Sequence, residues 1–174
     1  MSLFLITGSA GSGKSEVCLE LKLRGYIAFD TDDDGLARWQ NKTTAFIHPK
    51  SSIKSHMRTP SFLKDHWWVI PTNEMDDIQK KAVNSCAFIC GSVANEDKLR
   101  KYFDKVFALQ VSDDMLRDRL LTRTTNDWGK QPHELELTIS KNKRELEIHK
   151  KFGDIIIDGS FPVAEVVDKI VSKI

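Results

Sequence analysis

The sequence predicts an α/β protein with three layers, in which a five-stranded parallel sheet lies between two layers of helices. Short apolar runs alternate with helical patterns along the chain, as expected for parallel strands joined by crossover helices. The first run is followed directly by a glycine-rich turn and then a helical segment. The length of 174 residues suits one domain, 1–174, with its own core.

Five apolar runs are expected to form the sheet: 3–7, 26–30, 87–91, 106–111 and 154–158. Few polar residues interrupt them, which indicates burial on both faces, as in parallel sheets. Numbering these strands along the chain, we expect them to lie in the order 2-3-1-4-5.

Helical patterns are expected at 14–24, 72–83, 114–123, 133–152 and 163–171. Gly25 can adopt the left-handed conformation that ends the first helix. Ser112 or Asp113 is a suitable N-cap for the third. In the fourth, which is the longest, Leu135, Ile139 and Leu146 lie near helical spacing.

The turn after the first strand, "GSAGSGKS", matches the nucleotide-binding loop pattern G-x-x-x-x-G-K-[ST]. Closely spaced backbone N–H groups at a helix N-terminus suit a phosphate chain. The residues predicted to bind the nucleotide are Gly8, Ser9, Ala10, Gly11, Ser12, Gly13, Lys14 and Ser15. Lys14 is expected to reach the β- and γ-phosphates, and the Ser15 hydroxyl to ligate Mg²⁺. A glycine-rich turn that binds nothing is the alternative, which the flanking strand and helix disfavour.

An acidic cluster, "FDTDDDG", follows the second strand, where open parallel sheets bind ligands. Phosphoryl transfer needs one carboxylate near magnesium and another that orients or deprotonates the acceptor hydroxyl. Asp30 and Asp32 are the candidates for these two roles. The alternative is that Asp32, Asp33 and Asp34 only cap a helix over 35–42.

Arg119 and Arg123 share one helix face, because they are four residues apart. Guanidinium groups stabilise the charge on a transferring phosphoryl group, so these arginines suit a catalytic lid at 124–134. The alternative is an amphipathic helix with solvated arginines.

Residues 42–70 are basic, aromatic and proline-containing without a clear period. Loops this long are usually functional or mobile. We expect an acceptor-binding insertion with short helices and a small strand within 66–70. Arg38 and Arg58, with nearby tryptophans, are candidates to bind the acceptor, although core packing is the default for each tryptophan.

The composition of the chain restricts the classes of partner and the compartment that it suits. With 26 basic and 25 acidic residues, the chain lacks the basic excess typical of nucleic-acid binding. The three cysteines form no C-x-x-C pair, and their odd number argues against a disulfide framework. Both features favour a reducing cytoplasm as the location of the chain. No apolar run is long enough for a membrane span, and the start shows no export signal. The chain is expected to be a monomer or homodimer.

In the order of its motifs the chain resembles the small P-loop kinases of the nucleoside monophosphate kinase and shikimate kinase group. "DKVFALQVSDDMLRDRLLTR" is also similar to bacterial proteins labelled AAA-family ATPase or nucleoside kinase. The resemblance implies that Asp30 supports magnesium, Asp32 contacts the acceptor hydroxyl, and Arg119 and Arg123 belong to a lid helix. It also implies that Gly91 lies near the acceptor. By the same resemblance, the loop after the last strand, with Ser160, holds the nucleotide base.

These features predict an ATP- and Mg²⁺-dependent kinase that phosphorylates a nucleoside, a nucleotide or a hydroxylated metabolite. The strand "AFIC" ends without the Walker B aspartate that AAA machines generally require, which argues against a mechanical ATPase. One alternative is a regulatory nucleotide-binding module with weak ATPase activity and no acceptor. A nucleic-acid end kinase is a second, supported only by the basic and aromatic residues of 42–70.

Overall fold

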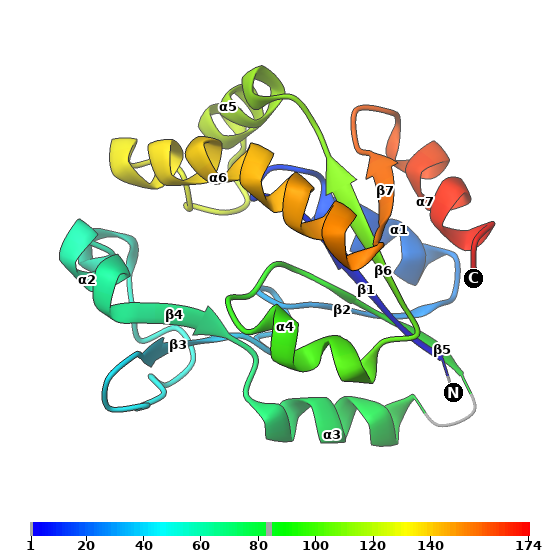
Figure 1. Ribbon diagram of the computed structural model, residues 1–174, viewed down its shortest axis with the longest axis horizontal. Helices are drawn as coiled ribbons and strands as arrows, with labels where there is room; N and C mark the ends of the chain where they lie inside the picture. The colour runs from blue at the N-terminus through cyan, green and yellow to red at the C-terminus, as the bar shows by residue number, and fades with distance from the viewer. Residues whose placement is uncertain (1, 83–84) are drawn as a thin grey trace.

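The computed structural model describes residues 2–82 and 85–174 (Figure 1). Its main sheet has five parallel strands: β1 (Ser2–Thr7), β2 (Ile27–Asp30), β5 (Cys86–Cys90), β6 (Lys105–Gln110) and β7 (Ile155–Asp158). They lie in the order β2-β5-β1-β6-β7. These are the five strands predicted from the sequence, so the expected order 2-3-1-4-5 is confirmed.

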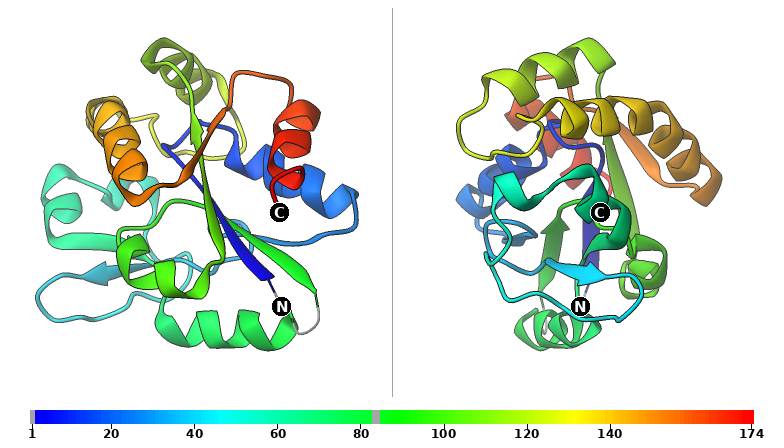
Figure 2. Two further views of the ribbon diagram at one scale, coloured as in Figure 1. Left: turned by 45° about the vertical axis from the view of Figure 1, so that its right-hand side comes forward. Right: turned by 90° about the vertical axis from the view of Figure 1, so that its left-hand side faces the viewer.

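Helices cover both faces of this sheet (Figure 2). On one face α1 (Lys14–Leu23) and α7 (Val163–Val171) pack against Phe4 and Ile6 of β1. On the other face α3 (Thr72–Lys81) and α4 (Glu96–Leu99) pack against Leu3 and Leu5. Successive β1 side chains therefore enter opposite cores, which is why all four residues from Leu3 to Ile6 are apolar. The expected three-layer architecture is confirmed.

Two further helices pack against each other, α5 (Asp113–Thr122) and α6 (Pro132–Phe152), and α6 lies beside β6 and β7. The Ser112 side chain accepts a hydrogen bond from the backbone N–H of Met115 and caps α5, as the sequence predicted. All five expected helices are present. Val83, the last residue of the second expected helix, lies outside the described residues.

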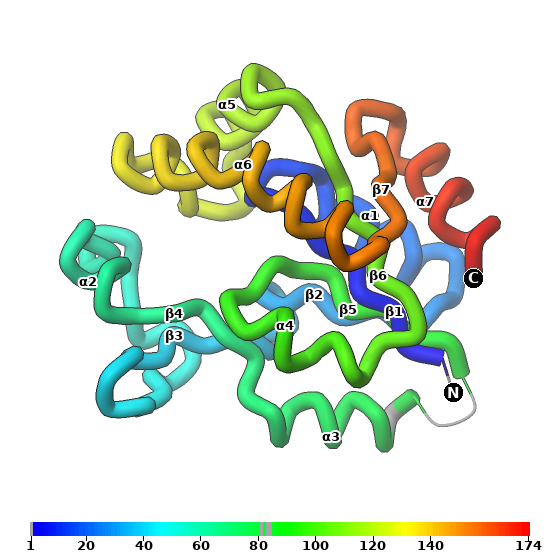
Figure 3. The backbone as a smooth tube through the Cα atoms, viewed as in Figure 1, coloured from blue at the N-terminus to red at the C-terminus, as the bar shows by residue number. Residues whose placement is uncertain are grey.

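A two-stranded antiparallel sheet stands apart from the main one, formed by β3 (Arg38–Asn41) and β4 (His66–Val69) (Figure 3). The strand expected within 66–70 is confirmed, but the alternative of a helix over 35–42 is wrong. Trp39 pairs across the sheet with Trp68, and their ring centroids are 5.1 Å apart. Cross-strand aromatic packing of this kind depends on a distant segment and overrides a local capping signal.

Between β3 and β4 lie the short helices expected in the insertion, η1 (Ser55–Met57) and α2 (Pro60–Asp65). α4 continues into another short helix, η2 (Arg100–Tyr102), and neither was predicted. No helix within the described ranges is long and apolar enough to cross a membrane.

Candidate functional site

One continuous cleft of about 1430 Å³ opens at the carboxyl ends of the parallel strands. The loops after β1, β2, β5 and β7 all line it, together with parts of 42–70 and 124–134. Every residue that the sequence predicted for the site lines this cleft except Gly8 and Ser160. The fold therefore brings together motifs that are more than 100 residues apart in the chain.

The glycine-rich loop depends on glycine most strictly at Gly8. Its φ is +134°, and a Cβ there would lie 2.4 Å from the carbonyl oxygen of Leu109. The loop leads into α1, whose N-cap Gly13 also has a positive φ, so the free N–H groups of the helix start face the cleft. This geometry suits an anion.

Lys14 turns back onto its own loop. Its Nζ donates hydrogen bonds to the carbonyl oxygens of Gly8 and Ser9, at 2.7 and 2.9 Å. Burial lowers the pKa of Lys14, while the negative charges of Asp32, Glu145 and Asp30 act in the opposite direction. Among these charges that of Asp32 has the largest effect, and both residues line the same cleft.

The acidic turn after β2 is organised by Asp30. Its buried Oδ1 accepts hydrogen bonds from the backbone N–H groups of Asp32 and Asp33, at 2.8 and 3.1 Å. This turn presents Asp32 to the cleft. Burial and the nearby Asp30 and Asp32 charges raise the pKa of Asp33. The crowded carboxylates and the neighbouring Ser15 hydroxyl are hard oxygen ligands that suit Mg²⁺.

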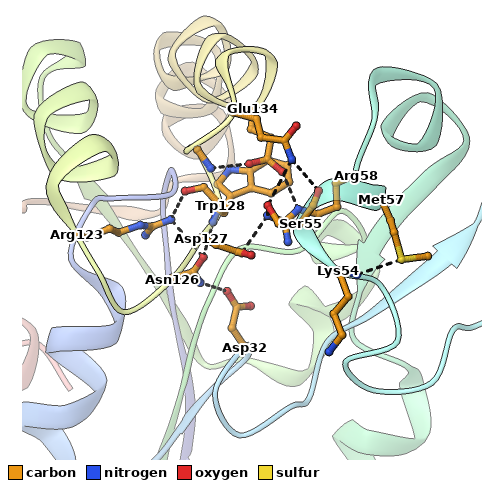
Figure 4. Close-up of polar contacts among 12 residues, drawn as sticks. Asp32, Lys54, Ser55, Met57, Arg58, Arg123, Asn126, Asp127, Trp128 and Glu134 are labelled. Atoms are coloured by element: carbon orange, nitrogen blue, oxygen red, sulfur yellow. Dashed lines mark hydrogen bonds and ion pairs between the residues drawn. The ribbon is translucent and has the colours of Figure 1, made fainter.

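Asp32 is held from two sides, and Figure 4 shows its contact with Asn126. Its Oδ1 accepts a hydrogen bond from Trp68 Nε1 at 3.1 Å, and its Oδ2 accepts one from Asn126 Nδ2 at 3.4 Å. Trp68 belongs to the 42–70 insertion and Asn126 to the 124–134 segment. Both segments therefore contact the carboxylate expected to orient the acceptor.

The two predicted arginines of α5 and its C-terminus differ in their surroundings. Arg119 donates to the carbonyl oxygens of Gly11 and Gly159, at 3.3 and 3.1 Å, and so connects the glycine-rich loop to the loop after β7. Arg123 donates to the carbonyl of Trp128 at 2.7 Å, but its buried Nε has no hydrogen-bond partner among the described residues. Burial lowers the pKa of Arg123. An anion in the cleft would stabilise its charge.

The contacts of Arg38 and Gly91 are with residues outside the glycine-rich loop, whereas Ser160 follows Gly159, which lies against the carbonyl oxygen of Ser12 in that loop. Arg38 donates to the carbonyls of Gly35 and Ala37 and pairs with Glu74, although it still borders the cleft. Gly91 lies against Thr31, because a Cβ there would be 1.9 Å from Thr31 Oγ1. Ser160 is exposed beside Gly159.

The guanidinium group of Arg58 is already paired with carboxylates of the protein. It forms ion pairs with Glu134 and Asp127 at the edge of the cleft. Acceptor binding by Arg38, Arg58 and Gly91, and cofactor binding by Ser160, stay predictions.

The sequence reasoning missed a polar stripe on α6. Ser9 Oγ lies 3.0 Å from Asn142 Oδ1 and 2.6 Å from Glu145 Oε2 and shares its one proton between these two acceptors, so α6 holds the glycine-rich loop. The sequence does contain a pattern that indicates this stripe, a series of polar residues at helical spacing: Glu134, Thr138, Asn142, Glu145 and His149. Four of these are buried and Glu145 is half-buried.

Only part of the apolar pattern expected on this helix forms core. Leu135 is buried, but Ile139 and Leu146 are half-buried. The buried face of α6 is mainly polar because it meets loop groups such as the carbonyl oxygen of Val111 and the hydroxyl of Ser9 rather than a hydrophobic surface.

Comparison of the sequence finds no matching family model and no curated relative. Solved structures do match over nearly the whole chain. A gluconokinase from Sinorhizobium meliloti 1021 is 21% identical with a TM-score of 0.57, and the match covers 98% of this chain and 90% of that one. A deoxyadenosine kinase from M. mycoides with bound dATP is 16% identical with a TM-score of 0.55, covering 99% and 98% of the two chains.

A shikimate kinase from Acinetobacter baumannii in complex with shikimate has a TM-score of 0.61 at 12% identity, covering 99% of this chain and 92% of that one. The chain thus has a P-loop nucleotide-binding fold. More narrowly, that fold is the one found in small P-loop kinases, as the resemblance of its motifs implied.

Proposed function

We propose that this protein is an ATP-dependent kinase that transfers the γ-phosphoryl group to a small-molecule acceptor. The observation that carries the proposal is the position of Asp32 in the same cleft as the glycine-rich loop, where its charge acts on Lys14. A loop lysine and a carboxylate that face one cleft can serve the donor phosphates and the acceptor hydroxyl respectively. The small-kinase fold of the structural neighbours supports this reading.

In this proposal the residues from Gly8 to Ser15 hold the triphosphate, with Lys14 turning from its own carbonyls to the β- and γ-phosphates. Asp32 takes the proton of the acceptor hydroxyl as the hydroxyl oxygen bonds to the γ-phosphorus. The bond from that phosphorus to the β,γ-bridging oxygen breaks, and ADP leaves. Arg119 and Arg123 stabilise the charge on the phosphoryl group.

Magnesium is expected beside Ser15 and Asp30. When bound there, the ion neutralises charge on the β- and γ-phosphates. In this proposal the hydroxyl of Ser15 and the carboxylate of Asp30 supply the oxygen ligands from the protein.

The acceptor side of the cleft is lined by indole rings and amines. Trp39 lies between Trp68 and Trp128, with ring centroids at 5.1 and 6.3 Å. Lys50 and Lys54 line the same region. Rings suit a flat base and amines suit a phosphate. Among the three acceptor classes, nucleosides and nucleotides therefore fit this cleft better than a hydroxylated metabolite without a ring. In this proposal 42–70 is the acceptor-binding part of a single kinase-like domain, and 124–134 is its lid.

The test is a coupled assay of ADP release against nucleosides, nucleoside monophosphates and small hydroxylated metabolites. The Lys14→Met variant should abolish acceptor-dependent turnover. Asp32→Asn should lower kcat by roughly 10²- to 10⁴-fold while ATP binding is little changed, because Asp32 acts on the acceptor proton.

The matched control is Asp33→Asn, which removes a neighbouring exposed carboxylate of the same turn and should be nearly neutral. Equal losses in both aspartate variants would contradict the role of Asp32. Slow ATP hydrolysis that no acceptor accelerates would favour a regulatory module instead.

A further inference from the structure

The 42–70 insertion and the 124–134 segment are joined by a buried ion pair. Arg58 Nε lies 2.6 Å from Glu134 Oε1. The Glu134 side chain has no exposed surface, and that of Arg58 is 9% exposed. Burial opposes the charge of Arg58, but its hydrogen bonds to Glu134 and Asp127 outweigh burial and raise its pKa. Two segments that are far apart in sequence thus meet through a buried ion pair.

Further hydrogen bonds complete this junction (Figure 4). Glu134 Oε2 accepts from the backbone N–H of Gly129 at 2.9 Å, so both carboxylate oxygens are used. Arg58 Nη2 donates to Asp127 at 2.9 Å. Gln131 Nε2 donates to the carbonyl oxygen of Ser55 at 2.7 Å. Buried charges stabilise a contact only when they are satisfied in this way, and the same demand makes the contact specific.

The two joined segments also hold Asp32 from opposite sides, through Trp68 and Asn126. Arg123, directly before the second segment, carries the buried Nε without a partner that an incoming phosphate can satisfy. The ion pair therefore joins two segments that both contact Asp32, and one of them begins directly after Arg123.

We infer that Arg58 and Glu134 are positioning residues, whose ion pair couples nucleotide binding at the 124–134 segment to the conformation of the acceptor segment. This inference rests on the proposed function for its meaning in catalysis. The coupling itself depends only on nucleotide binding. Arg58 then acts through Glu134 and Asp127, and not as a direct ligand of the acceptor.

The experiment measures hydrogen exchange of the backbone amides of 53–58 with and without ADP and Mg²⁺. Because a typical allosteric coupling is about 5-fold or more, nucleotide should slow exchange in the wild type by at least that factor. In Glu134→Gln, which keeps the shape but removes the charge, this slowing should be lost while ADP affinity stays close to wild type. Arg58→Lys keeps the charge but loses the two-sided guanidinium contact, and should behave in the same way.

The matched control is Glu136→Gln on the same helix. Glu136 pairs with Arg117 at 3.7 Å in an exposed contact, so its loss should leave the slowing intact. The inference would be overturned if ADP and Mg²⁺ slowed hydrogen exchange in both Glu134→Gln and Arg58→Lys as much as in the wild type. It would also be overturned if nucleotide did not change the exchange of the 53–58 amides in the wild type. If Glu134→Gln fails to fold, Arg58→Lys carries the test. Failure of the proposed function would instead appear as a wild type that no acceptor activates, with the exchange result unaffected.

Discussion

Lys14 occupies a position that favours ligand binding over stability of the folded chain. Burial lowers its pKa below 10.5, so between the two pKa values the folded state binds fewer protons than the unfolded state. The free energy of unfolding contributed by this residue therefore rises with pH across that window, up to about the unfolded pKa of 10.5. The charged form of the amine is therefore held in the folded state at a cost that its bonds to Gly8 and Ser9 only partly offset.

We therefore expect Lys14→Met to unfold at a urea concentration equal to or higher than that of the wild type at pH 7. The difference between the two proteins should shrink as the pH approaches 10, because the wild type then loses the unfavourable charge. Urea titrations at pH 7, 8, 9 and 10 measure this. A variant that is clearly less stable at pH 7 would show that Lys14 supports the fold rather than the ligand.

At the residue scale, the sequence predicted the side chains that belong to short local motifs. The glycine-rich loop, Asp30 and Asp32 were found because their spacing carries the chemistry within a few residues. Glu145 was not found, since only the packing of α6 on the loop brings it to Ser9. Arg58 was recognised as important, but its ion pairs with Glu134 and Asp127 depend on a segment about 70 residues away and could not be derived.

At the scale of elements, α6 is the helix that supports the nucleotide loop. Asn142, which is 4% exposed, accepts from Ser9 Oγ and donates to the carbonyl oxygen of Val111 and to Asp113 Oδ1. All the polar atoms of this amide are therefore engaged between the helix, the loop and the start of α5.

We expect Asn142→Ala to lower the free energy of unfolding by about 1–3 kcal/mol, because it leaves buried groups without partners. It should also weaken ADP binding, since Ser9 loses one of its anchors. Urea unfolding and a nucleotide titration measure the two effects. Ser140→Ala is the control on an exposed face of the same helix and should change stability by no more than about 0.5 kcal/mol. Equal effects of the two substitutions would contradict a special role for Asn142.

The elements that the sequence predicted well are those with a strong period or a terminal signal. β1 and β6 are apolar on both faces, α5 begins directly after its N-cap Ser112, and α7 begins at Val163 as expected. β3 escaped prediction because its partner β4 lies 25 residues further along and provides the tryptophan that stabilises it. The short α4 has too few residues to show a period.

At the scale of the whole molecule, the cleft is formed by segments that meet only in the folded chain. Loops after four strands and the two joined segments all contribute to it. A nucleotide that binds there has no equivalent site in the unfolded state. Binding must then stabilise the entire fold in proportion to the ligand concentration.

ATP with Mg²⁺ at about 100 times its dissociation constant should therefore add roughly 2.7 kcal/mol to the free energy of unfolding. For a chain of this size the melting temperature should rise by roughly 5–10 °C. The shift should shrink when EDTA removes Mg²⁺ and should disappear in Lys14→Met, which keeps the fold but loses the phosphate contact. Thermal melts over a range of ATP concentrations measure it. A wild type whose melting temperature does not move with ATP would exclude nucleotide binding in this cleft, and the kinase proposal with it.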